Sequence, residues 1–148
     1  MAELAGVAAA AHFLSIVWDD DAPGDQLLLA ALDRLVSAYH DAPEAGPADT
    51  DVEPPREDGA ALYRQVADRF PAYGLYPVSD PTALPDDASA MGDAVDDITD
   101  LTLDMREVVW RAENFGPDDA HWFFRLFYFH WGRHARELAL YLHSRQFG

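Results

Sequence analysis

The chain has 148 residues, 49% of them hydrophobic, and this is enough to bury a core within one domain spanning residues 1–148. It carries 27 acidic residues against 10 arginines and no lysine, and the net charge of −17 disfavours binding to nucleic acids or anionic membranes. The lack of cysteine excludes disulfides, thiolate metal ligands and a cysteine nucleophile. The amino-terminal segment lacks the basic start of a secretory signal, and no apolar stretch is long enough to span a bilayer, so we expect a cytoplasmic protein.

Apolar residues recur at helical spacing in the first half of the chain, between proline-rich segments. A first helix, with an apolar stripe of Leu4, Val7, Ala11, Leu14 and Trp18, is predicted to end in the segment "DDDAPGD" (19–25). A second helix is capped by Asp25, and the loop 43–56, with its four prolines, follows it. A shorter helix then ends before Pro71. The segment 72–87 is predicted to be irregular, and its apolar residues suggest a loop that packs onto the body.

The second half of the chain predicts two long helices. The first runs from about Ala88 to Asn114, and Gly116 and Pro117 then mark a stop and a restart. The last helix runs from there to about Ser144. The short connection between these helices indicates antiparallel neighbours. We therefore expect an all-α fold, a bundle of about five helices in which the last two are long and antiparallel.

Four aspartates share one stripe of the first long helix, at intervals of four, three and four residues: Asp93, Asp97, Asp100 and Asp104. Three explanations are open. The acids could pair with Arg125, Arg133 and Arg136 of the last helix. They could dock a basic protein partner. They could also bind a divalent cation, because carboxylate oxygens suit Mg²⁺ and Mn²⁺.

The cation hypothesis rests on acids three residues apart, Asp97 with Asp100 and Asp104 with Glu107. Helical phosphohydrolases that act on nucleoside triphosphates use such pairs on two neighbouring helices, whereas both pairs lie on one helix here. Metal ligation by Asp97, Asp100, Asp104 and Glu107, with Mg²⁺ or Mn²⁺ as the cofactor, is therefore the alternative hypothesis. No other cofactor is predicted.

The last helix is apolar on two faces. The expected core stripe comprises Phe124, Phe127, Trp131, His134, Leu138 and Tyr141. The second face comprises Trp122, Leu126, Phe129 and Leu140. Either the helix is central and contacted on all sides, or this face meets another protein chain, which makes a homodimer plausible.

His130 and His134 lie one helical turn apart, but a di-iron bundle needs further glutamates from other helices. Because His134 falls within the aromatic core stripe, we expect a structural role for it, as a hydrogen-bonded neutral imidazole. The chain has no G-x-S-x-G nucleophile motif and no phosphate-binding glycine-rich loop.

The motifs "DITDLTLDMREVV" (97–109) and "FFRLFYFHWGRHARELALYLH" (123–143) resemble a bacterial domain-of-unknown-function family, number 5063. The similarity extends more weakly over residues 60–145. The resemblance implies a helical bundle in a small bacterial protein, without an established activity, and it implies that Asp100, Asp104, Trp131 and Gly132 matter. His130 departs from the aromatic residue of the family pattern. Gly132 in mid-helix suggests a close helix crossing.

The leading functional hypothesis is a non-catalytic domain that acts through protein–protein contact, including self-association. It rests on the second apolar face and on the lack of a convergent catalytic set in the sequence. The alternative is a divalent-metal-dependent phosphohydrolase of the all-α kind that uses the aspartate stripe.

Overall fold

The computed structural model describes residues 4–87 and 89–148, and these contain six α-helices and one two-stranded sheet. The helices are α1 (Ala5–Trp18), α2 (Asp25–Asp41), α3 (Gly59–Arg69), α4 (Ala94–Phe115), α5 (Pro117–Leu126) and α6 (Tyr128–Phe147). The strands β1 (Leu75–Ser79) and β2 (Ser89–Asp93) are antiparallel, and the short 3-10 helix η2 (Pro85–Asp87) lies between them. The mostly helical class is confirmed, but the predicted count of five helices and the lack of strands are wrong.

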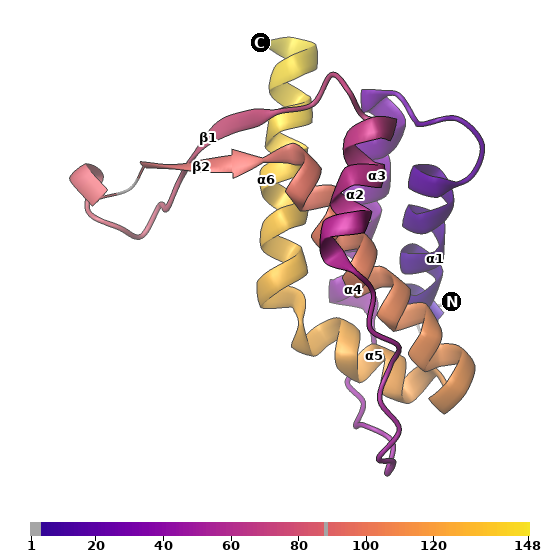
Figure 1. Cartoon of the computed structure of the whole chain (residues 1–148). Coiled ribbons are helices and arrows are strands. Elements are labelled where there is room, and N and C mark those ends of the chain that lie inside the picture. Colours follow the sequence, from indigo (N-terminus) through magenta and orange to yellow (C-terminus); the bar gives the residue numbers. More distant parts are fainter. Residues whose placement is uncertain (1–3, 88) are drawn as a thin grey trace.

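Helix α4 is the centre of the molecule. It packs against α1, α3, α5 and α6, and α2 lies against α1 and α6 (Figure 1). Helices α4 and α6 run in opposite directions, and the β1–β2 hairpin projects sideways from the bundle (Figure 1). This arrangement leaves one flank of α4 facing α6 and another facing α3.

The last helix, predicted to be continuous as far as about Ser144, is instead broken at Phe127 into α5 and α6. The indole N–H of Trp131 donates to the backbone carbonyl of Phe124 at 2.7 Å. This bond satisfies a carbonyl in the last turn of α5, where carbonyls lack a partner further along the helix. Trp131 and Phe124 are both fully buried, so the break is packed inside the core.

The buried face of α1 also differs from the predicted stripe. Leu4 is exposed, and the residues that face the core are Gly6, Ala9, Ala10, Phe13 and Val17. Gly6 is required on this face because α1 lies close to α5 at that point. A Cβ atom at Gly6 would come within 2.8 Å of the side chains of His121 and Phe124. The Gly6 backbone N–H donates to Nε2 of buried His121 at 3.1 Å.

Gly132 serves a different purpose from the predicted close helix crossing. A Cβ atom at this position would lie 2.6 Å from the ring of Tyr128, one turn earlier in α6. The ring of Tyr128 stacks on that of Tyr39 in α2, with centroids 3.7 Å apart. The glycine therefore makes room for an aromatic contact between α2 and α6.

The β1–β2 hairpin replaces the predicted irregular segment and the predicted first turn of the long helix. Ala88, the predicted start of that helix, lies outside the described residues, and residues 89–93 form β2. Asp93 ends β2 and caps α4, because its side chain accepts from the backbone N–H of Val95 at 2.9 Å. The Ala94 N–H donates to the carbonyl of Gly74, so both ends of the hairpin are fixed at its base.

Among the described residues, no helix has the length and apolar character required to cross a membrane. The cytoplasmic location stays a prediction.

Candidate functional site

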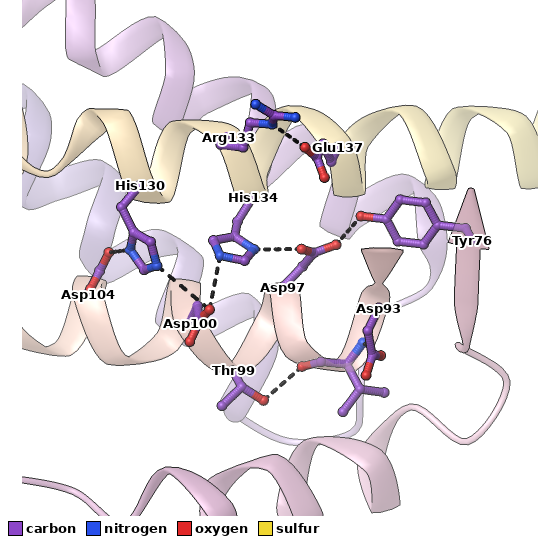
Figure 2. Close-up of polar contacts among 11 residues, drawn as sticks. Tyr76, Asp93, Asp97, Thr99, Asp100, Asp104, His130, Arg133, His134 and Glu137 are labelled. Atoms are coloured by element: carbon purple, nitrogen blue, oxygen red, sulfur yellow. Dashed lines mark hydrogen bonds and ion pairs between the residues drawn. The ribbon is translucent and has the colours of Figure 1, made fainter. Parts of the chain in front are cut away.

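An acidic stripe of α4 faces two histidines of α6 (Figure 2). Asp97, Asp100 and Asp104 recur at intervals of three and four residues, and His130 and His134 lie four apart, so each set projects from one side of its helix. Because the helices are antiparallel, His130 meets Asp104 and His134 meets Asp97. Asp100 lies between the two histidines. We call these five residues the Asp–His seam.

His134 bridges two carboxylates. Its Nδ1 lies 2.6 Å from Oδ1 of Asp97, and its Nε2 lies 2.9 Å from Oδ2 of Asp100. Burial alone would lower the pKa of His134, but the hydrogen bonds and charges of Asp100 and Asp97 outweigh it and raise the pKa to about 10. The raised pKa and the carboxylates at both ring nitrogens contradict the expected neutral imidazole and favour a protonated His134 at neutral pH.

His130 repeats this arrangement one turn away. Its Nδ1 lies 2.7 Å from Oδ2 of Asp104, and its Nε2 lies 3.7 Å from the same Oδ2 of Asp100 that faces His134. Each histidine thus directs Nδ1 to its own outer aspartate. Both Nε2 atoms converge on Asp100.

The two outer aspartates and the central one differ in environment. The side chains of Asp97 and Asp104 are 4% and 12% exposed, whereas that of Asp100 is 28% exposed. Burial raises the pKa of Asp97 and of Asp104, against the opposing hydrogen bonds from the histidines. Burial acts in the same direction on Asp100, but the hydrogen bond from His134 and the charges of both histidines hold its pKa below the usual value. Asp100 is therefore the carboxylate that stays ionised and open to solvent.

The convergent atoms have the spacing of metal ligands. Asp100, His130 and His134 each offer a ligand atom, and these atoms all lie within 4.8 Å of one another. Ligands at ~2.1 Å from a tetrahedral ion are about 3.4 Å apart. This value falls between the 2.9 Å and 3.7 Å that separate Asp100 Oδ2 from the two Nε2 atoms. The three side chains are therefore close enough together to share one ion.

Not every predicted metal ligand lies in the seam. Asp97, Asp100 and Asp104 do, but Glu107 pairs with Arg111 on its own helix, with 2.8 Å between Oε2 and Nε. Asp93 caps α4 and accepts a hydrogen bond from Tyr63. Three residues that were not predicted as part of the metal site contact the predicted aspartates: His130, His134 and Tyr76 of β1.

Of the three explanations for the aspartate stripe, pairing with Arg125, Arg133 and Arg136 is wrong. Arg125 donates to the backbone carbonyls of Tyr39 and Ala42. Arg133 and Arg136 bind Glu137 and the hydroxyl of Tyr128, respectively. The arginines point to other parts of the molecule, and the histidines take the position between the acids.

The predicted second apolar face of the last helix is only partly exposed to solvent. Leu126, Phe129 and Leu140 are 49%, 77% and 67% exposed. Trp122 is half-buried against the core, and the guanidinium of Arg111 lies 5.5 Å from its ring centroid. The three exposed residues therefore form the part of this face that another chain could reach.

No family model matches this sequence, and comparisons with curated proteins and with solved structures gave no significant match. The resemblance of residues 97–143 to family 5063 stays a prediction.

Proposed function

We propose that this domain binds a divalent transition-metal ion through Asp100, His130 and His134. The observation that carries the proposal is the convergence of the two Nε2 atoms on Asp100 Oδ2, with each Nδ1 held by a separate carboxylate. Histidines that bind metals nearly always donate their other ring N–H to an outer carboxylate or carbonyl, which fixes the tautomer and the ring orientation. Asp97 and Asp104 are placed for that role.

Two imidazoles in the ligand set favour Zn²⁺, Fe²⁺ or Co²⁺ over Mg²⁺, Mn²⁺ and Ca²⁺, which prefer oxygen ligands. In this respect the proposal differs from the all-carboxylate Mg²⁺ or Mn²⁺ site that the sequence suggested. Three protein ligands leave coordination positions open, as in catalytic rather than structural zinc sites. The side chains of Asp100 and His130 are 28% and 36% exposed, so a water molecule or a small substrate could reach such an ion. A metal-dependent hydrolase is the activity that this arrangement supports best.

Titration with Co²⁺, followed by visible absorption and calorimetry, tests the proposal. The wild-type protein should bind one ion, and the spectrum should show nitrogen and oxygen ligands. His134→Gln should weaken binding by more than the roughly 10- to 100-fold that is typical for loss of an outer-shell partner. His143→Gln is the matched control, because His143 lies on the same helix, is exposed and is outside the seam. If the wild type shows no saturable binding, or if both variants bind equally well, the proposal is wrong.

A second candidate function is self-association through α6. It is supported by the exposure of Phe129 and Leu140, which are eleven residues apart and therefore lie on one side of the helix. The occupant that fits this face is a second copy of the chain, with Leu126 at its edge.

Sedimentation velocity over a range of protein concentrations tests self-association. The wild type should form a dimer, and Phe129→Ser combined with Leu140→Ser should abolish it. Leu27→Ser is the control, because Leu27 of α2 is 59% exposed and lies outside this face. A wild type that stays monomeric at high concentration rules out this candidate.

A further inference from the structure

Tyr76 connects the β1–β2 hairpin to the Asp–His seam. Its hydroxyl donates to Oδ2 of Asp97, while Oδ1 of the same carboxylate takes the bond from Nδ1 of His134 (Figure 2). Asp97 therefore has one oxygen for the hairpin and one for the histidine. A rotation of this carboxylate would disturb both bonds at once.

Beyond the bonds that fix its base, the hairpin is packed onto the bundle mainly through this tyrosine. Of the ten residues in the two strands, Tyr76 alone is buried, with 8% of its surface exposed. An isolated two-stranded hairpin is at best marginally stable in water, so its order depends on what it packs against. The Tyr76 ring stacks on Tyr141 of α6, with centroids 4.8 Å apart.

The sequence of β2 accommodates the tyrosine ring. Gly92 is the residue paired with Tyr76 across the hairpin. A Cβ atom at Gly92 would lie 2.7 Å from the nearest atom of the Tyr76 ring, closer than real Cβ contacts. Only glycine lets the ring lie flat across β2 with its hydroxyl directed at Asp97. The position of the hydroxyl is thus fixed by the hairpin and by α6 together.

We infer that Tyr76 is a positioning residue of the metal site, and that docking of the hairpin and binding of the ion strengthen each other. The inference rests on the proposed metal-binding function. Tyr76 holds Asp97, Asp97 holds the imidazole of His134, and the imidazole presents Nε2 to the ion. Thermodynamic linkage makes the coupling reciprocal: the factor by which the docked hairpin tightens ion binding is the factor by which the ion tightens docking.

The experiment compares wild type with Tyr76→Phe, which keeps the ring and removes the hydroxyl. Co²⁺ affinity should fall about 10- to 100-fold, the usual cost of losing an outer-shell partner. In the wild type, Co²⁺ should slow amide hydrogen exchange in β1 and β2, and in Tyr76→Phe this added protection should shrink. In the Zn²⁺ complex, the Nδ1–H proton signal of His134 should be sharp in the wild type and exchange-broadened in the variant. Loss of packing alone would not produce that spectral change.

Tyr73→Phe is the matched control. Tyr73 also donates its hydroxyl to an aspartate, Asp25, at 2.6 Å, but this pair lies outside the seam. The substitution should leave Co²⁺ affinity unchanged. Gly92→Ala is an independent test, since it displaces the Tyr76 ring without altering any ligand, and it should weaken binding in the same direction as Tyr76→Phe.

The outcomes separate the two proposals. If the wild type does not bind Co²⁺, the proposed function is wrong, and the inference falls with it. If the wild type binds but Tyr76→Phe binds equally well, the positioning role is overturned while the metal site stands. If binding leaves hydrogen exchange in the wild-type hairpin unchanged, the coupling is overturned.

Discussion

Raising the pH from 7 to 9 should tighten Co²⁺ binding about a hundredfold, because His134 has to lose a proton before its Nε2 can take an ion. Asp100 and Asp97 outweigh the effect of burial and raise the pKa of His134 to about 10, so the imidazole is protonated throughout this range. One proton is released for each ion bound. The apparent Kd should therefore fall about tenfold per pH unit and level off above the pKa. Competition with a chelator of known pH dependence, at micromolar Co²⁺, measures the slope.

Asp97→Asn provides the discriminating variant for this pH dependence. Without the Asp97 charge, the pKa of His134 should fall part of the way towards its ordinary value of 6.5, because Asp100 still raises it, and the affinity should level off at a lower pH than in the wild type. His143→Gln should keep the wild-type slope, because His143 is exposed and outside the seam. A wild-type affinity that stays constant over the two pH units would contradict the assignment of His134 as a ligand.

Trp131→Ala should lower the free energy of unfolding by about 3–5 kcal/mol, the range for removing a large buried aromatic side chain. The indole is fully buried and packs against the rings of Phe124 and Tyr128, with centroids 4.6 Å and 4.9 Å away. Its N–H also satisfies the Phe124 carbonyl at the break between α5 and α6. The substitution leaves both a cavity and an unpaired buried acceptor. Urea denaturation followed by circular dichroism measures the change.

Phe129→Ala is the control for Trp131→Ala. Phe129 lies two residues earlier on the same helix but is 77% exposed, so the change in stability should stay within about 0.5 kcal/mol in the monomer. The loss of unfolding free energy in Trp131→Phe should lie between those of Trp131→Ala and Phe129→Ala, because this variant keeps part of the packing but loses the hydrogen bond. Equal effects of Trp131→Ala and Phe129→Ala would show that the helix break is not held by the indole.

Helical periodicity predicted much of the bundle because the long helices are amphipathic. The apolar face of α4 was found from residues three and four apart, such as Ile98, Leu101 and Met105, and all three are fully buried. The break at Phe127 has no such signal, since neither proline nor glycine marks it. It depends on a side-chain bond from Trp131, which only the folded packing reveals.

The β1–β2 hairpin was not predicted, for a different reason. Its second strand, "SAMGD", lacks the branched and aromatic residues that favour strands, and Pro77 interrupts the first. Its order comes from distant contacts, chiefly Tyr76 with Asp97 and Tyr141. Neither partner can be identified from local sequence.

The aspartates of the candidate site could be predicted from the sequence, whereas the histidines that face them could not. Spacing alone placed Asp97, Asp100 and Asp104 on one stripe of α4. Which residues of the last helix would face them depends on how far α6 is displaced along α4. Formal charge favoured the arginines, but the observed register brings His130 and His134 opposite the acids.

The fixed base of the hairpin makes its tip suitable for engineering. Asp93 and the bond from Ala94 to Gly74 hold the base against α4, while residues 80–87, which follow β1, extend away from the bundle (Figure 1). A foreign peptide grafted between Pro81 and Pro85 would be displayed at a distance from the ligands and would leave Tyr76 in place. Exposed tips of this kind tolerate insertion best, so the domain could carry an epitope or a reporter there without a change to its ion-binding residues.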